Sequence, residues 1–136
     1  MVLTIPEITA PVSLKDAYNM NAVVLAFIGD AVHTLAVRTE LVLTHTSKTD
    51  KLHVMTSERV KASAQAELLD IIKDDLNETE TEIYMRGRNA HTATVAKNAT
   101  IADYKKATGF EAVIGYLYLT GQTERIKELL NKTVEQ

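Results

Sequence analysis

The chain has 136 residues, of which 46% are hydrophobic and 24% are charged. These values are typical of one globular domain with its own core, spanning residues 1–136, and they argue against disorder. The absence of cysteine excludes disulfides, thiolate metal sites and cysteine nucleophiles. The formal net charge is −3, so the chain as a whole lacks the strong basic excess of many nucleic-acid-binding proteins.

The charges are distributed unevenly along the chain. Residues 67–82 contain seven acidic side chains and one lysine, whereas residues 86–106 contain five basic side chains and one aspartate. One face of the protein can therefore be basic although the whole is acidic. No secretory signal is visible, and the apolar run over residues 22–28 is too short to span a membrane. We therefore expect a soluble, cytoplasmic protein with no membrane partner.

The N-terminal part of the chain predicts an extended arm followed by a helix. Both prolines lie before residue 12, which favours an extended arm over residues 1–12. Ser13 is typical of a helix N-cap. A long, mostly apolar helix is expected over residues 21–45, and Gly29 within it either bends the helix or lets another backbone approach closely.

The remaining segments also have helical hydrophobic periodicity, so the predicted class is all-α. Asn77 followed by Glu80 resembles a capping box at a helix start. Gly121 is expected to end the helix before it. The predicted segments are a helix over residues 51–76 with a break near Ser57, one from Asn77 to about Met85, a loop over 91–98, and helices over 101–119 and 123–134.

Two acidic side chains are candidates for chemistry. Asp30 lies in the long helix among apolar neighbours, where a carboxylate needs a partner such as a helix N-terminus, a basic side chain or a divalent cation. Glu111 shares a helix side with Thr108 and lies beside an apolar stripe. Spacing alone leaves open whether each is a structural acid, and it does not establish that the two come together.

Basic and amide side chains gather after the predicted helix that starts at Asn77. Arg86, Arg88 and Asn89 are followed by Lys97 and Asn98. Arginines at a helix end can satisfy its last carbonyl groups, and with neighbouring amides they can also bind RNA phosphates. The histidines form no HExxH motif, and phosphate-loop and nucleophile-elbow motifs are missing too. His33, inside a helix, is more typical of a packed side chain than of a metal ligand.

Three motifs, in order, resemble the catalytic domain of the ribonuclease III family. Residues 25–31 (LAFIGDA) resemble its signature helix, residues 60–68 (VKASAQAEL) its middle helix, and residues 110–116 (FEAVIGY) its second acidic motif. Residues 120–136 are too few for the double-stranded-RNA-binding domain that follows in full ribonuclease III. Together with the basic segment, this indicates a resemblance to the Mini-ribonuclease III group.

This resemblance implies the helical bundle of a ribonuclease III endonuclease domain and a Mg²⁺-dependent endoribonuclease that cleaves double-stranded RNA. It implies that the substrate is the precursor of 23S ribosomal RNA, whose ends the enzyme matures. Asp30 and Glu111 would be the catalytic residues and the Mg²⁺ ligands, and the ion would activate a water for attack on phosphorus. The resemblance also implies a homodimer. It leaves open whether a ribosomal protein helps to present the RNA.

The chain departs from the general family pattern at three acidic positions, which are here Val23, Ala26 and Thr108. Thr108, waters and RNA phosphate oxygens would then complete the metal's coordination. The missing carboxylates keep a second reading open, a non-catalytic module of the same fold that binds double-stranded RNA. The acidic character favours a third, a purely structural helical dimer. The expected RNA contacts are Lys61, Arg86, Arg88, Asn89, Lys97 and Asn98.

Overall fold

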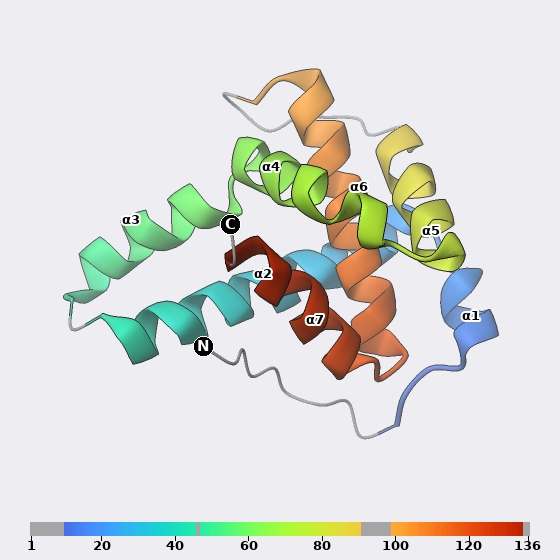
Figure 1. Ribbon diagram of the computed structural model, residues 1–136, viewed down its shortest axis with the longest axis horizontal. Helices are drawn as coiled ribbons and strands as arrows, with labels where there is room; N and C mark the ends of the chain where they lie inside the picture. Colours follow the sequence, from blue (N-terminus) through green and yellow to red (C-terminus); the bar gives the residue numbers. More distant parts are fainter. Residues whose placement is uncertain (1–9, 46, 91–98, 135–136) are drawn as a thin grey trace.

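The computed structural model describes residues 10–45, 47–90 and 99–134, and within these ranges all regular structure is helical. The prediction of an all-α fold is confirmed. The long helices α2 and α6 cross at the centre, and α3, α4, α5 and α7 pack around them (Figure 1). The elements are α1 (Leu14–Tyr18), α2 (Ala22–Thr44), α3 (Thr49–Val60), α4 (Ala62–Ile72), the 3₁₀ turn η1 (Lys73–Asp75), α5 (Glu78–Asn89), α6 (Ile101–Leu119) and α7 (Thr123–Val134).

The crossing of α2 and α6 depends on two glycines. A Cβ atom on Gly29 of α2 would lie 1.8 Å from the carbonyl oxygen of Glu111, and one on Gly115 of α6 would lie 1.9 Å from the carbonyl oxygen of Leu25. Neither position can therefore carry a side chain at this helix separation. The sequence allows two roles for Gly29, a bend or a close approach of another backbone. The structure shows the close approach.

Side-chain caps start the helices where the sequence predicts them. The Ser13 hydroxyl accepts a hydrogen bond from the backbone N–H of Asp16. Asn77 and Glu80 form a complete capping box at the start of α5, each side chain bonding to the backbone N–H of the other residue. Gly121 ends the turn after α6 with φ of 74°, a conformation that suits glycine.

Two predicted boundaries are wrong. The break between α3 and α4 falls at Lys61, whose ψ of 159° is extended, and not near Ser57. Helix α5 continues to Asn89 instead of ending near Met85. Its last turn packs against α6, where Gly87 approaches Gly109 closely enough that a Cβ would lie 2.9 Å from the Gly109 Cα. That contact is tertiary and leaves no periodic signal. The predicted loop over 91–98 and most of the N-terminal arm lie outside the described residues.

Helix α2 is only partly enclosed by the bundle. It is long and apolar enough by composition to cross a membrane, but 44% of its most apolar window is buried in the protein. Leu25 and Val32 are core residues, whereas Leu35 is 41% exposed and Val37 is buried. Near the start of α2, the side chain of Phe27 is 81% exposed. Helix α2 is therefore central to the bundle, as a mostly apolar helix predicts, but part of its apolar surface stays open to solvent.

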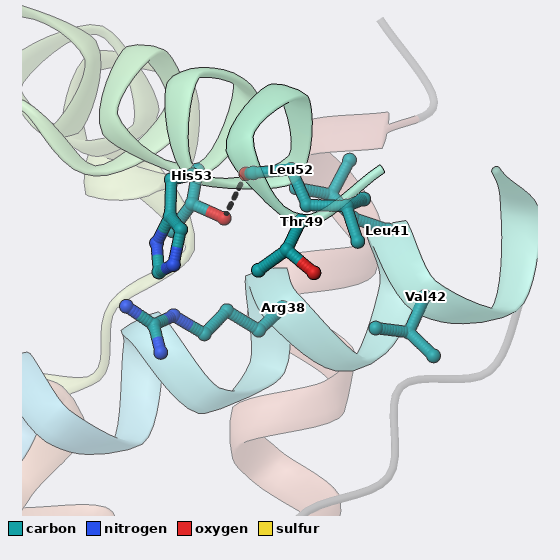
Figure 2. Close-up of a pocket in the computed structure, with 7 residues that line it drawn as sticks. Arg38, Leu41, Val42, Thr49, Leu52 and His53 are labelled. Atoms are coloured by element: carbon teal, nitrogen blue, oxygen red, sulfur yellow. Dashed lines mark hydrogen bonds between the residues drawn. The ribbon is translucent and has the colours of Figure 1, made fainter. Parts of the chain in front are cut away.

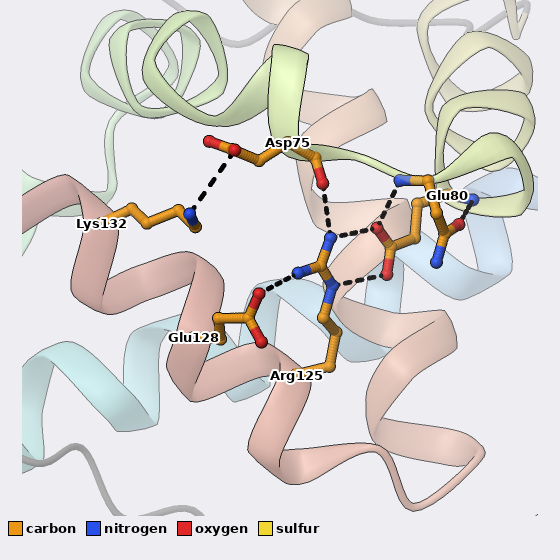
Figure 3. A network of polar contacts seen from close by, with 6 residues as sticks. Asp75, Glu80, Arg125, Glu128 and Lys132 are labelled. Carbon is orange, nitrogen blue, oxygen red and sulfur yellow. Dashed lines mark hydrogen bonds and ion pairs between the residues drawn. The ribbon is translucent and has the colours of Figure 1, made fainter.

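An ionic network fastens α7 to the start of α5 (Figure 3). Glu80 is 1% exposed, and its carboxylate accepts two hydrogen bonds of 2.9 Å from the Arg125 guanidinium. Arg125 also donates to the carbonyl oxygen of Asp75 at 2.6 Å. One arginine thus neutralises a buried carboxylate and ties three elements together.

Candidate active site

The two candidate acids lie side by side although they are distant in the sequence. Asp30 follows Gly29 in α2, and Glu111 supplies the backbone carbonyl that Gly29 approaches. The Asp30 carboxylate lies close enough to the Glu111 carboxyl group to raise its pKa. The glycine crossing therefore brings two carboxylates together at the junction of α2 and α6.

The electrostatics of Glu111 follow from this placement. Burial raises its pKa from 4.5 to about 8, and the neighbouring Asp30 carboxylate acts in the same direction. Asp30, by contrast, is exposed. Two carboxylates in one place repel each other when both are ionised, so the site favours either a proton or a cation between them.

A cavity of about 210 Å³ opens beside Glu111, between the start of α4 and the first half of α6. Its lining includes Lys61, which the sequence predicts as an RNA contact and which also pairs with Glu58 at 2.8 Å. Thr108 lines the cavity too, and its hydroxyl donates to the Tyr104 carbonyl oxygen at 3.0 Å, which leaves oxygen lone pairs to accept. The cavity therefore joins an acidic group, a cation and hydroxyl oxygen.

Gln65 is a residue of this site that sequence reasoning missed. It is 2% exposed, and its amide nitrogen contacts both His33 Nδ1 at 3.0 Å and Glu111 Oε2 at 3.4 Å. The available signal was a polar side chain between Ala64 and Ala66 on a helix with an apolar stripe. His33 itself is buried and packed, as its position in a helix predicts.

The general family pattern has three further acidic positions. Within the described ranges, no other acidic side chain takes their place beside Asp30 and Glu111. No group of three or more His, Cys, Asp or Glu side chains is arranged to hold a metal within those ranges. Ala26 and Thr108 are buried and Val23 is 37% exposed. The residues present offer two carboxylates and a hydroxyl, all of which would coordinate a metal through oxygen.

The structure divides the predicted RNA contacts into different environments. Arg88 and Asn89 line a shallow depression with Lys105 and Lys106, on the same half of α6 as the cavity beside Glu111. Arg88 donates to the Asn89 side-chain oxygen at 3.3 Å, whereas Lys106 pairs with Asp70 at 3.1 Å. These side chains make a basic surface beside the first half of α6, the helix that also carries Glu111.

Arg86 has a different environment. Its guanidinium donates to the carbonyl oxygens of Tyr18 at 2.7 Å and Met20 at 3.5 Å, beyond the end of α1, and lies 4.6 Å from the centre of the Tyr18 ring. Arg86 therefore satisfies carbonyl groups at the end of α1, and not those at the end of its own helix α5. Lys97 and Asn98 lie outside the described residues.

A separate cavity of about 140 Å³ lies between the C-terminal half of α2 and α3 (Figure 2). Arg38 and His53 point toward each other at one side, and the rest of the lining is Leu41, Val42, Thr49, Leu52 and Thr56. It contains no carboxylate. The acids that could act on a phosphodiester therefore lie at the α2–α6 junction and not here.

Comparison with known proteins identifies the family of the chain. The ribonuclease III domain family matches residues 23–122. Mini-ribonuclease 3 of Clostridium tetani is 45% identical over 121 residues, 88% of this chain and 80% of that protein. Mini-ribonuclease 3 of Streptococcus pneumoniae is 42% identical over 123 residues, 89% of this chain and 96% of that protein. A crystal structure of a Fusobacterium nucleatum protein has a TM-score of 0.79 at 31% identity, covering 88% of this chain and 96% of that one. The chain therefore belongs to the ribonuclease III family, in the group of the Mini-ribonuclease 3 proteins, and is an endoribonuclease.

Proposed function

We propose that this endoribonuclease cleaves double-stranded RNA in a Mg²⁺-dependent reaction, with Asp30 and Glu111 as its catalytic residues. The observation that carries the proposal is the proximity of these two carboxylates, of which Glu111 lines a cavity together with Lys61. Phosphodiester hydrolysis places negative charge next to the acids, and a divalent cation between them and the phosphate would neutralise it.

The residues present fit a magnesium ion. Mg²⁺ prefers hard oxygen ligands and is commonly bound by one or two carboxylates, with waters and substrate phosphates completing the octahedron. Asp30 and Glu111 supply the two carboxylates, and a cation would stabilise the ionised form of Glu111 that burial and the Asp30 carboxylate disfavour. When bound, Mg²⁺ supplies a Lewis acid and a more acidic water.

The other residues of the cavity would act on the RNA. Lys61, at the start of α4, can pair with an RNA phosphate across the cavity from Glu111. Thr108 can accept a hydrogen bond from water or from a ribose hydroxyl. Arg88 and Asn89, at the end of α5, would bind the RNA backbone beside the first half of α6. Lys97, Asn98 and Arg86 remain predictions from the sequence, and the bonds of Arg86 to the end of α1 favour a structural role for it.

The substrate that we propose is the precursor of 23S ribosomal RNA in the cytoplasm, because of the resemblance to the Mini-ribonuclease III group. A ribosomal protein as helper belongs to the same proposal. A homodimer is supported by the apolar face at the start of α2, where Val24 is 56% and Phe27 is 81% exposed. Burying such a face against a second copy would place two sites on one duplex.

The test is cleavage of a duplex from a 23S precursor by the purified protein, with end mapping. We expect Mg²⁺-dependent cleavage, and loss of it in Asp30→Asn and in Glu111→Gln with the fold retained. Glu124→Gln is the matched acid-to-amide control, since Glu124 pairs with Lys127 on α7. A gel shift with Ca²⁺ in place of Mg²⁺ separates binding from cleavage. Binding without cleavage by the wild type would favour the non-catalytic module, and neither binding nor cleavage would favour the structural dimer.

A further inference from the structure

Three helices contribute to a buried polar chain behind the acidic pair. Gln65 of α4 lies between His33 of α2 and Glu111 of α6, and its amide nitrogen is 3.0 Å from His33 Nδ1 and 3.4 Å from Glu111 Oε2. An amide group carries two N–H donors, so one can point to each acceptor. Because the side chain is 2% exposed, water cannot replace either partner without cost.

His33 decides which end of the amide faces the carboxylate. Burial lowers the pKa of His33 to about 4, with Arg59 acting in the same direction, so the imidazole is neutral near pH 7. A neutral imidazole has one N–H and one acceptor nitrogen. With Nδ1 accepting from Gln65, the proton is on Nε2. The ring is held edge-on by Phe110, with centroids 5.1 Å apart at an angle of 81°.

We propose that Gln65 is a positioning residue for Glu111, and that His33 keeps the Gln65 amide in the orientation that donates to the carboxylate. The inference rests on the proposed function, since it concerns how Glu111 is presented to a divalent cation. The bond from Gln65 fixes Oε2 and leaves Oε1 of Glu111 free of that contact. At 3.4 Å the bond is long, as catalytic hydrogen bonds often are before substrate binds.

The alternative amide orientation explains why His33 is needed. With the amide reversed, its oxygen would face the Glu111 oxygen, and two acceptors would meet in a buried place whenever Glu111 is ionised, as it must be to bind a cation. An Nδ1–H tautomer of His33 would favour that reversed amide, because it would donate to the amide oxygen.

The first experiment needs no variant and no metal. The ¹⁵N NMR shifts of the His33 ring in the metal-free protein identify the nitrogen that carries the proton. We expect the proton on Nε2 and an acceptor Nδ1 hydrogen-bonded to Gln65. A proton on Nδ1 would overturn the proposal, because Gln65 would then present its oxygen to Glu111.

The second experiment substitutes Gln65→Met, which keeps the length of the side chain and removes both donors. We expect the single-turnover cleavage rate at saturating RNA to fall about 10- to 100-fold, the usual cost of losing a partner of a metal ligand. The RNA dissociation constant without metal should stay within about twofold, since Gln65 is buried. Gln122→Met is the control, because Gln122 bonds to Thr120 away from the site. An unchanged cleavage rate in Gln65→Met overturns the inference.

The third experiment is a pair of variants at His33 that separates positioning from packing. His33→Asn keeps an acceptor near the place of Nδ1, whereas His33→Leu removes it. We expect His33→Asn to retain more cleavage than His33→Leu at matched thermal stability, and equal losses would contradict the role of His33. This pair and the NMR measurement decide the question even if Gln65→Met does not fold. Failure of the wild type to cleave duplex RNA would instead remove the proposed function, and the tautomer result would stand separately.

Discussion

The peptide carbonyl of Glu111 fills the space where a side chain at position 29 would begin. A Cβ on Gly29 would lie 1.8 Å from that oxygen. The next residue after Gly29 is Asp30, and the residue that bears the carbonyl is Glu111, the other acid of the proposed catalytic pair. The close crossing of α2 and α6 and the assembly of the acidic pair are therefore the same structural feature.

Gly29→Ala is expected to destabilise the protein and remove activity together. The added methyl group meets rigid backbone, so the helices must separate, at a cost of about 3 kcal/mol. Chemical denaturation measures the loss, and cleavage of duplex RNA measures the effect on the site. Thr39→Ala, on the same helix, should change stability by less than about 1 kcal/mol. Near-wild-type stability of Gly29→Ala would contradict the crossing geometry.

The stability of the metal-free protein should decrease as the pH rises from about 6.5 to 8. The pKa of Glu111 is raised from 4.5 to about 8 in the folded state, mainly by burial and further by Asp30, so the folded protein binds more protons than the unfolded chain in this range. The lowered pKa of His33 has the opposite effect, but only below its ordinary value of 6.5.

Thermal unfolding between pH 6.5 and 9 measures this slope, with Asp30→Asn as the comparison. Removing the neighbouring charge lowers the pKa of Glu111 and should flatten the slope. Saturating Mg²⁺ should do the same, because a cation also stabilises the ionised carboxylates. A slope that Asp30→Asn leaves unchanged would mean that the two carboxyl groups do not interact.

Arg125→Met should cost about 3–5 kcal/mol of stability, because it leaves the buried Glu80 carboxylate without its counter-charge. The bond to the Asp75 carbonyl oxygen is lost as well. Lys127→Met provides the comparison, since its pair with the exposed Glu124 should contribute about 0–1 kcal/mol. Urea unfolding of both variants measures the two losses of unfolding free energy. Equal losses would show that the network in Figure 3 stabilises the protein no more than an exposed ion pair does.

Phe27→Asp should convert the proposed dimer into a monomer without unfolding it. The side chain is 81% exposed, so the charge costs little in one copy and much in an apolar interface. Sedimentation at micromolar concentration measures the association state. Val42→Asp is a matched control, since Val42 is 62% exposed near the other end of the same helix. A wild-type protein that is monomeric while it cleaves duplex RNA would contradict the dimer.

Arg88→Gln should weaken RNA binding and reduce its salt dependence. Each phosphate contact releases counterions, so losing one lowers the slope of log affinity against log salt by about 1. The measurement is duplex binding in Ca²⁺ at several salt concentrations. Lys132→Gln is the control, as Lys132 pairs with Asp75 at 3.5 Å on α7. The same salt slope in Arg88→Gln and wild type would remove Arg88 from the RNA surface.

Features that depend on neighbouring residues were predictable from the sequence, and features that depend on contacts between helices were not. The N-caps at Ser13 and Asn77 and the helix over residues 101–119 follow from side-chain hydrogen bonding and periodicity within a few residues. The end of α5 was placed too early, because its last turn is stabilised by contact between Gly87 and Gly109, which belong to different helices. Gln65 was missed for the same reason, since both of its partners come from other helices.

The sequence by itself determined an all-α protein, its helix starts, and a resemblance to ribonuclease III through motifs around Asp30 and Glu111. Only the tertiary structure decided that these acids adjoin, that Arg86 binds the end of α1, and that Phe27 faces outward. Caps and periodicity act over neighbouring residues and are written in the local sequence. The pairing of carboxylates depends on how closely two helices can cross, which the backbone contact between Gly29 and Glu111 sets.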